Sequence, residues 1–137
     1  MKKIELKTKT LRQRVTIPAN PMEVYEAYMD AEKHAEFTGS GATSDPKVGG
    51  EFTAWDGYIT GKNLELEPGK KIVQEWRSSD FPDGYASSRL ELILKESKGF
   101  TELTMVHSGV PEEIANDIAQ GWKDFYWEPL KKHFKKA

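Results

Sequence analysis

The stretch GWKDFYWEPLKKHF, residues Gly121–Phe134, decides how this sequence is expected to fold. It carries two tryptophans, two phenylalanines and one tyrosine within fourteen residues. Aromatic side chains bury large areas, so such a segment favours packing against a broad apolar partner. We expect it either to fill a core or to form one wall of a cavity. These two interpretations overlap, because the wall of a cavity is also part of a core.

The residues before and within this stretch follow the period of an amphipathic helix. At about 100° per residue, one arc of the helix collects most of the apolar side chains: Ile114, Ala115, Ile118, Ala119, Trp122, Phe125, Tyr126 and Leu130. The pattern predicts one helix over residues 111–134 whose apolar side covers a sheet. Pro129 lies inside this pattern, and we expect the helix to bend there, because proline cannot donate to the carbonyl of Phe125.

The first forty residues predict one strand and two short helices. Apolar and polar residues alternate over 11–17, which is typical of a half-buried strand. Asn20 and Pro21 are a helix N-cap and first helical residue. A second short helical turn is expected to carry Ala35 and Phe37.

After residue 38, turn signals recur at short intervals between runs of β-branched and aromatic residues. The predicted strands are EFTAW, YITGKNLELE, KIVQEWRSS, YASSRLELILKE and FTELTMVHS. Short connections make consecutive strands antiparallel neighbours. The sequence therefore predicts an α+β fold, with a curved antiparallel sheet of six or seven strands, two short helices after the first strand and a long C-terminal helix.

Length and composition limit the class of protein. The chain has 137 residues, and we expect one domain over 1–137. It has no cysteine, which excludes a disulfide framework or a thiolate metal site. The net charge of −2 gives no reason to expect nucleic-acid binding. The lysine-rich start lacks the apolar core of a signal peptide, and no apolar run reaches the length of a membrane span, so we expect a cytoplasmic setting.

Several separated motifs also carry a family resemblance. They are WDGYITGKNLELEPGKKIVQEWR, FPDGY, TELTM, SGVP and GWKDFYWEPLKKHF. In this order they resemble the C-terminal domain of the activator of the heat-shock protein 90 ATPase and its stand-alone microbial homologues, over nearly the whole chain. The order of elements is similar to the helix-grip fold of the START-like, or SRPBCC, superfamily. The resemblance implies two functions: binding of apolar ligands between helix and sheet, or assistance to a chaperone ATPase in a stress response.

The candidate cavity residues come from the predicted helix and from the strand faces that it would cover. They are Trp122, Phe125, Tyr126, Trp76, Gln74, His107 and Tyr58. Gln74 and His107 are polar residues on otherwise apolar strand faces, and a buried Tyr126 hydroxyl needs a hydrogen-bond partner. Each of the three is either an internally satisfied core residue or an orienting contact for a ligand.

Trp127 falls outside the apolar arc of the helix and is expected to be exposed. It either packs on a neighbouring loop or marks a contact surface for a partner protein. His34 and His133 are expected to face solvent.

No catalytic or metal-binding arrangement is recognisable. SGVP lacks the spacing of a nucleophile elbow, and no carboxylate pair is placed for acid–base chemistry. No second ligand stands at metal-binding spacing from His107. We therefore expect a non-enzymatic protein without a cofactor or metal. The leading hypothesis is a domain that binds a small apolar or amphipathic molecule; the alternative is a chaperone-associated interaction module.

Overall fold

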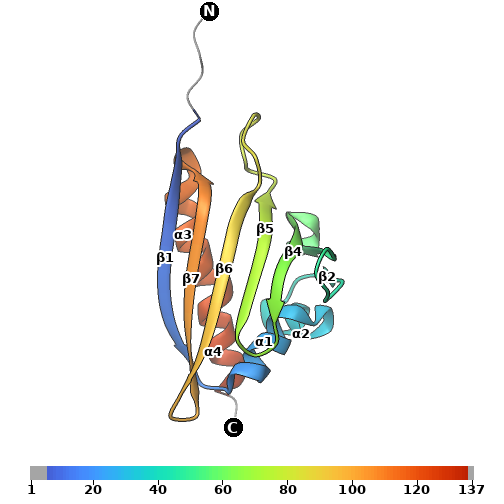
Figure 1. The fold of residues 1–137 in the computed structure, drawn as a ribbon, viewed down its shortest axis with the longest axis vertical. Helices are drawn as coiled ribbons and strands as arrows, with labels where there is room; N and C mark the ends of the chain where they lie inside the picture. The colour runs from blue at the N-terminus through green and yellow to red at the C-terminus, as the bar shows by residue number, and fades with distance from the viewer. Residues whose placement is uncertain (1–5, 136–137) are drawn as a thin grey trace, which may run out of the picture.

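The computed structural model describes residues 6–135, in which a seven-stranded antiparallel sheet carries a long helical run across one face (Figure 1). The strand order is β1–β7–β6–β5–β4–β3–β2, so the first and last strands of the chain are neighbours. The strands are β1 (Thr8–Ile17), β2 (Thr43–Ser44), β3 (Glu51–Ala54), β4 (Ile59–Glu67), β5 (Lys71–Ser78), β6 (Ser88–Ser97) and β7 (Phe100–Pro111). The predicted α+β helix-grip fold is confirmed.

The helical elements follow the predicted order. They are α1 (Pro21–Met29), α2 (Ala31–Thr38), the short turns η1 (Trp55–Gly57) and η2 (Glu112–Ile114), α3 (Ala115–Trp122), the π-helical segment η3 (Lys123–Trp127) and α4 (Glu128–Phe134). The last four form one continuous run from Glu112 to Phe134. This run begins one residue after the predicted start, because Pro111 is the last residue of β7.

A capping box fixes the start of α1. The Asn20 side chain accepts a hydrogen bond from the Glu23 N–H at 2.9 Å, and the Glu23 carboxylate accepts from the Asn20 N–H at 3.2 Å. The two bonds satisfy donors that a helix terminus otherwise leaves unpaired. Pro21 follows at the first helical position, as the sequence predicted.

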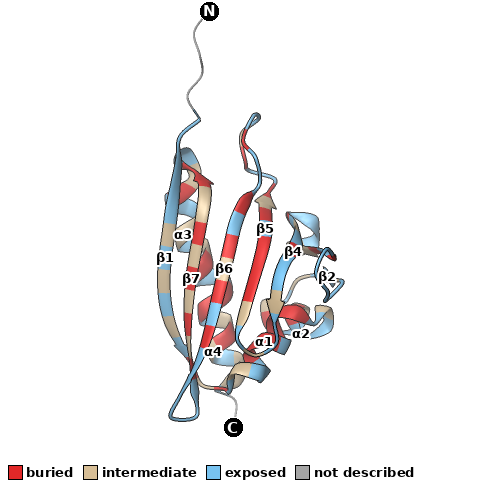
Figure 2. Cartoon of the chain, viewed as in Figure 1, coloured by how far each residue is buried: buried red, intermediate tan, exposed pale blue. Residues whose placement is uncertain are grey.

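Strand alternation and two register shifts shape the face of the sheet that the helix covers. Buried and more exposed residues alternate along β6 and β7, as the colours of Figure 2 show. Register shifts lie between Lys9 and Leu11 in β1 and between Asn63 and Glu65 in β4. Such irregularities bend a strand and increase its twist, which allows a sheet to wrap around a helix.

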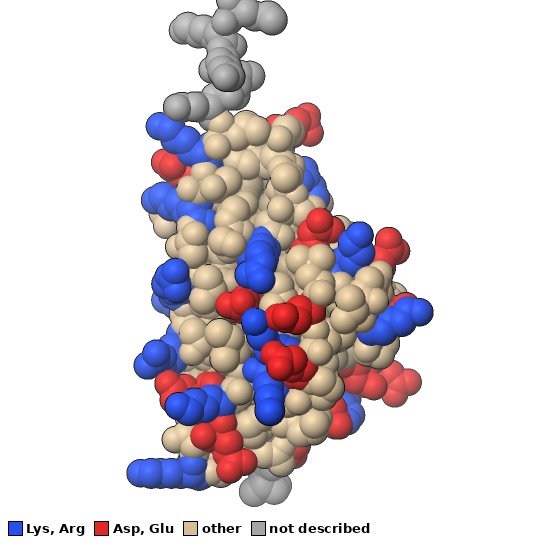
Figure 3. Space-filling model, in the orientation of Figure 1, with Lys and Arg blue, Asp and Glu red and all other residues tan. Residues whose placement is uncertain are grey.

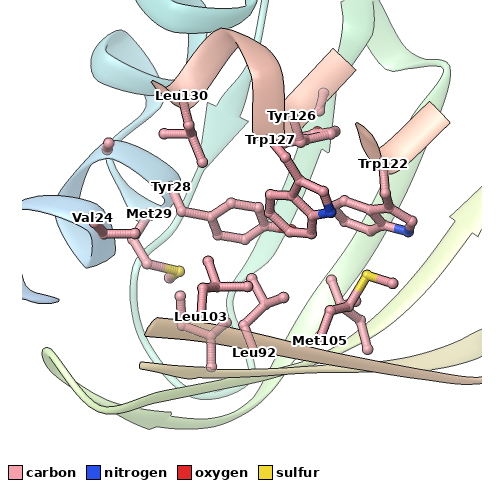
Figure 4. Packing of buried hydrophobic residues seen from close by; sticks show 14 of the residues in the cluster. Val24, Tyr28, Met29, Leu92, Leu103, Met105, Trp122, Tyr126, Trp127 and Leu130 are labelled. Atoms are coloured by element: carbon pink, nitrogen blue, oxygen red, sulfur yellow. The ribbon is translucent and has the colours of Figure 1, made fainter. Parts of the chain in front are cut away.

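The core lies between this face and the C-terminal helical run. Figure 4 shows Trp122, Trp127 and Leu130 reaching from the helix toward the strands, and Leu92, Leu103 and Met105 rising from the strands to meet them. Val24, Tyr28 and Met29 of α1 close one side of the same cluster. Burying one large apolar side chain contributes about 1.5–3 kcal/mol, so this layer supplies much of the free energy that holds helix to sheet.

The helical run is not a regular α-helix near Pro129. In η3, the Glu128 N–H donates to the carbonyl of Lys123, five residues earlier. This π-helical turn lies just before Pro129, the residue at which the sequence predicted a bend. A wider turn suits this place, because the proline ring clashes with the carbonyl four residues before it in a regular α-helix.

The π-helical segment overturns two sequence predictions. A turn with one extra residue rotates the following side chains by about 100° relative to an α-helix. Trp127 was predicted to be exposed, but it is 4% exposed and its ring stacks on Trp122 with centroids 5.2 Å apart. Phe125 was placed in the apolar arc, but it is 54% exposed. The rotation turns Trp127 toward the sheet and Phe125 away from it.

A glutamine of β1 fixes the rotated helix in place. The Gln13 side chain accepts a hydrogen bond from the Trp127 indole N–H at 2.6 Å and donates to the carbonyl of Ala119 at 2.9 Å. One side chain thus connects the edge strand to residues on both sides of Trp122. These bonds satisfy the polar groups that the rotation buries.

The face of the sheet that points away from the C-terminal helix carries both acidic and basic side chains. In Figure 3, basic side chains gather along the edge that β1 occupies, and acidic and basic groups intermingle over the middle strands. There, Lys71 lies 2.8 Å from Glu65 and 3.8 Å from Glu91, which also contacts Arg89 at 3.5 Å. Ion pairs that solvent reaches contribute little to stability, so these charges make the face polar and add little to the stability of the sheet.

We predict a large loss of stability for one truncation in η3 and a small loss for a second truncation nearby. Trp127→Ala should lower the free energy of unfolding by about 3–5 kcal/mol, because it empties a buried site and removes the bond to Gln13. Phe125→Ala, the matched control, should cost less than about 1.5 kcal/mol, because half of that ring already faces solvent. Urea denaturation of both variants measures the difference. A larger loss for Phe125→Ala would contradict the rotation described here.

Candidate functional site

A cavity of about 360 Å³ lies between the start of the C-terminal helical run and strands β4 and β5. Its lining residues are Trp55, Tyr58, Ile59, Trp76, Asp80, Ile114, Asp117, Ile118, Gly121, Trp122, Phe125 and Tyr126. The volume falls within the range of small-molecule pockets, about 300–1,000 Å³. The lining is mostly aromatic and aliphatic, which suits an apolar ligand.

Helical spacing places one wall of this cavity. Ile114, Ile118 and Trp122 stand four residues apart and therefore share a face of the helix. Gly121 and Phe125 form a second row at the same spacing. Gly121 widens the cavity, because a Cβ added at this position would meet only the Phe125 ring, at 3.7 Å.

The cavity has a buried floor and an open mouth. Ile59 of β4 and Trp76 of β5 are buried, and so are Trp122 and Tyr126 of the helix. The lining residues that solvent reaches most are Tyr58, Asp80, Asp117 and Phe125. The polar and charged groups of the site thus gather at its mouth, while its interior is aromatic.

One buried polar atom in the floor has no partner. The Trp76 indole N–H has no hydrogen-bond acceptor among the residues that the structure describes, although Trp76 is only 4% exposed. Its ring packs edge-on against His107 at 4.7 Å and beside Trp122 at 5.9 Å. An unpaired buried donor costs about 1–3 kcal/mol, which is unusual in a core whose other polar groups are paired.

His107 lies behind the cavity wall and is fully paired. Its Nδ1 accepts from the Trp122 indole N–H at 3.1 Å, and its Nε2 lies 2.7 Å from the Ser88 hydroxyl. Burial lowers the pKa of His107 to about 3, so the ring is neutral. With Nδ1 accepting, the proton sits on Nε2 and is donated to Ser88. The Ser88 hydroxyl in turn donates to the carbonyl of Trp76 at 2.7 Å.

This proton arrangement gives no support to a serine nucleophile. A general base must accept the proton of the hydroxyl that it activates, whereas His107 already donates to Ser88. Both residues are also buried, with Ser88 2% exposed. The pair fastens Trp76 and Trp122 in place and thereby makes the cavity wall rigid.

Gln74 belongs to a different network and does not line the cavity. Its Oε1 accepts from the Tyr28 hydroxyl at 3.0 Å, and its Nε2 donates to Asn63 Oδ1 at 2.9 Å. Asn63 then donates to the carbonyls of Asp45 and Lys47 at 2.9 and 3.1 Å. The chain of bonds ties α1, two strands and a surface loop together.

The Tyr126 hydroxyl finds its partner in His34. The His34 Nδ1 bonds the carbonyl of Tyr28 at 2.9 Å, so its Nε2, 3.1 Å from the Tyr126 hydroxyl, is the acceptor for that phenol. Burial lowers the pKa of His34 and raises that of Tyr126. The prediction that His34 faces solvent is wrong: it is 6% exposed, because α2 lies against α4.

The structure brings together five of the seven predicted cavity residues. Trp122, Phe125, Tyr126, Trp76 and Tyr58 all line the cavity, although Phe125 and Tyr58 stand at its mouth rather than inside. Gln74 and His107 are absent from the lining, since neighbouring protein groups occupy their polar atoms.

Sequence reasoning missed the rest of the lining. Ile114, Ile118 and Gly121 were detectable, because they follow the helix period. Trp55 was not, because it sits in η1 with φ of +52°, a turn that no strand or helix pattern predicts. The role of Asp80 and Asp117 at the mouth depends on the turn after β5 and helix α3 meeting in space.

Within residues 6–135, no group of three or more histidines and carboxylates is placed to hold a metal ion. None of the described helices combines the length and the apolar character that crossing a membrane requires.

Comparison with known proteins identifies the family. The family model for the "Activator of Hsp90 ATPase homolog 1-like protein" matches residues 18–135. The chain belongs to this family. The family resemblance inferred from the sequence motifs is confirmed.

Curated relatives agree with this assignment, and a solved structure shares the fold. The chain is 32% identical over 127 residues to an activator of 90 kDa heat shock protein ATPase homolog of Dictyostelium discoideum, covering 93% of this chain and 33% of that protein. It is 30% identical over 131 residues to homolog 1 of Homo sapiens, covering 96% and 38%. The chain thus spans little more than a third of these relatives. An HSP90 activator from Plasmodium falciparum shares the fold, with a TM-score of 0.84, 22% identity, and coverage of 90% and 94%.

We predict that the protein loses stability as the pH falls from 7 to 5. His107 binds a proton near pH 6.5 in the unfolded chain but only near pH 3 when folded. Protonation therefore favours the unfolded chain, and stability that is present above pH 6.5 is lost as the pH falls. One such histidine accounts for roughly 2 kcal/mol over this range. His34 acts in the same direction.

Urea denaturation at each pH measures this loss. His107→Phe should lower stability at pH 7, because Trp122 and Ser88 lose a partner, and should flatten the slope between pH 7 and 5. A slope in His107→Phe equal to that of the unaltered protein would contradict the assignment.

Proposed function

We propose that this chain is a non-enzymatic helix-grip domain that binds a small, mostly apolar molecule in the cavity between the C-terminal helix and the sheet. The observation that carries the proposal is the cavity itself, about 360 Å³ in volume and lined mainly by aromatic and aliphatic side chains. Solid packing is the rule in protein interiors, and voids larger than a few waters are rare. A cavity of this size at the helix–sheet interface supports a binding role.

The unpaired Trp76 N–H supports the same proposal. A ligand that carries an acceptor, such as an ether, hydroxyl or carbonyl oxygen, would satisfy this donor after a small shift of the surrounding rings. Recovering a lost hydrogen bond adds to affinity. The proposed ligand is therefore an aromatic or alicyclic molecule with at least one oxygen acceptor.

The expected affinity is weak. A bicyclic aromatic ligand that buries about 200 Å² of apolar surface gains about 5 kcal/mol at 25 cal/mol per Å². That gain alone corresponds to a dissociation constant of about 0.2 mM. Association entropy opposes the gain, so dissociation constants of about 0.2 mM or weaker are expected, and titrations should extend to millimolar concentrations of the ligand.

The proposal predicts that filling the cavity weakens binding. The probe is 1-naphthylmethanol, a neutral bicyclic aromatic with one hydroxyl, titrated by calorimetry. Gly121→Leu, which projects a side chain from the helix into the cavity, should weaken its binding at least about tenfold. Gly121→Ala is the matched control: its methyl group meets only Phe125, so binding should change less than about threefold.

Circular dichroism establishes that both variants are folded. The absence of binding to the unaltered protein, or equal binding to Gly121→Leu, would overturn the proposal.

The second candidate function is assistance to a chaperone ATPase. Family membership favours it, because the curated relatives are named as activators of the 90 kDa heat-shock protein ATPase. The interaction surface proposed at Trp127 has no structural support, since that residue is buried. Phe125, exposed and packed edge-on against Trp55 at 5.4 Å, is the aromatic that the helix presents to solvent instead.

This second candidate predicts a rise in ATPase rate. The heat-shock protein 90 of the organism that encodes the chain is assayed with and without saturating protein. A rise of at least about twofold that Phe125→Ala reduces would support it, because buried aromatic anchors dominate protein interfaces. An unchanged rate at saturation would exclude direct activation.

A further inference from the structure

The charged side chains that line the mouth of the cavity are both acidic. Asp80 and Asp117 line it, and no lysine, arginine or histidine among the described residues does. The chain carries 20 lysines and arginines against 22 aspartates and glutamates, so composition alone does not dictate this asymmetry. Both carboxylates are exposed, Asp80 in the turn that follows β5 and Asp117 in the first turn of α3.

The two carboxylates act on the same side chain. The Tyr58 hydroxyl donates a hydrogen bond to Asp80 Oδ2. The pKa of Tyr58 is raised, chiefly by burial, then by its bond to Asp80, with smaller contributions from the negative charges of Asp80 and Asp117. The mouth is thus a negative region built around one phenol, rather than two unrelated surface charges.

Arg77, the basic residue of β5 nearest in sequence to Asp80, contacts groups outside the cavity. The Arg77 guanidinium donates to the carbonyl of Tyr85 at 2.5 Å and lies over the Phe81 ring at 5.2 Å from its centroid. Successive residues of a strand point to opposite faces, so Arg77 faces away from the cavity that Trp76 lines. It therefore does not neutralise Asp80 from the cavity side.

Aromatic rings complete the mouth. Trp55, Tyr58 and Phe125 line it beside the carboxylates, and Trp55 and Phe125 meet edge-on at 5.4 Å. Aromatic faces attract cations, and the attraction grows where the cation is partly removed from water. Carboxylates and aromatic rings together favour an ammonium group and disfavour a carboxylate.

We propose that the cavity selects amphipathic molecules by charge: an aromatic or alicyclic body enters the apolar interior, and a cationic group rests at the mouth between Asp80 and Asp117, so that amphiphilic carboxylates such as fatty acids are excluded. This inference rests on the proposed ligand-binding function. Its independent support is the mostly apolar lining of the cavity and the unpaired N–H of Trp76, one of the lining residues, which point to a ligand without reference to the carboxylates.

Three probes that share one ring system test the inference. They are 1-naphthylmethylammonium, which is cationic, 1-naphthylmethanol, which is neutral, and 1-naphthoate, which is anionic. Calorimetry at low ionic strength should show the cation binding at least about tenfold more tightly than the anion, with the neutral probe between them. A unit charge about 4 Å from a carboxylate gains about 1–4 kcal/mol near a protein surface. Added salt should narrow the difference.

Variants without these two carboxylate charges test whether Asp80 and Asp117 cause the selectivity between cation and anion. The double variant Asp80→Asn, Asp117→Asn should reduce the difference between cation and anion to less than about threefold, while binding of the neutral probe is retained. Glu67→Gln, Glu96→Gln is the matched control, because it removes the same charge at the hairpin turns on the opposite end of the sheet. It should leave the selectivity unchanged.

The outcomes separate the two proposals. If the neutral probe binds but the cation and the anion bind equally, or the anion binds more tightly, charge selection is overturned and the cavity remains a binding site. If selectivity survives in the Asp80→Asn, Asp117→Asn variant, the two carboxylates are not its source and the inference fails. If none of the three probes binds, ligand binding itself fails and charge selection fails with it.

Discussion

The contact between the C-terminal helix and the sheet holds the rest of the structure in place. The rings of Trp122 and Trp127 stack at 5.2 Å and lie over a floor that includes Leu92, Leu103 and Met105. The chain has no cysteine, so no disulfide supplements this layer. Dispersion and burial act only over short distances, and the sheet must therefore bend to keep contact along the helix. The register shifts in β1 and β4 provide that bend.

The same contact explains why the cavity of about 360 Å³ lies at the start of the helical run. The later part of the helical run carries large side chains that reach the strands, among them Trp127 and Leu130. The earlier part carries Ile118 and Gly121, which leave space above Ile59 and Trp76. The cavity is thus a consequence of how side-chain size is distributed along one helix. Paired polar groups behind its wall, such as His107 with Ser88, keep this space from collapsing by locking the surrounding rings.

Family and fold do not by themselves decide the function of the chain. It belongs to the Activator of Hsp90 ATPase homolog 1-like family, and it corresponds to about a third of the curated relatives that it matches. Functions reside in sites rather than folds, so the geometry of the cavity carries the proposal of ligand binding. The two candidate functions also share a residue, because Phe125 is both a rim of the cavity and an exposed aromatic. An occupied cavity and a bound partner would therefore meet at the same place.

The sequence by itself determined the order of the long strands and of the helices, because hydrophobic periods of two and 3.6 residues are properties of the local backbone. The two-residue strand β2 was not among the predicted strands. The sequence also determined the apolar character of Trp122 and Tyr126 and of the strands they cover. The tertiary structure alone decided which way Phe125 and Trp127 point. The π-helical segment before Pro129 rotates these side chains relative to a regular α-helix, and the 3.6-residue period of the sequence pattern does not include that rotation. Tertiary packing also decided the burial of His34, which depends on α2 docking against α4. The tertiary structure also decided the roles of Gln74 and His107, which the strand pattern placed on an apolar face. The Gln74 side chain hydrogen-bonds Tyr28 and Asn63. The His107 ring hydrogen-bonds Ser88 and Trp122.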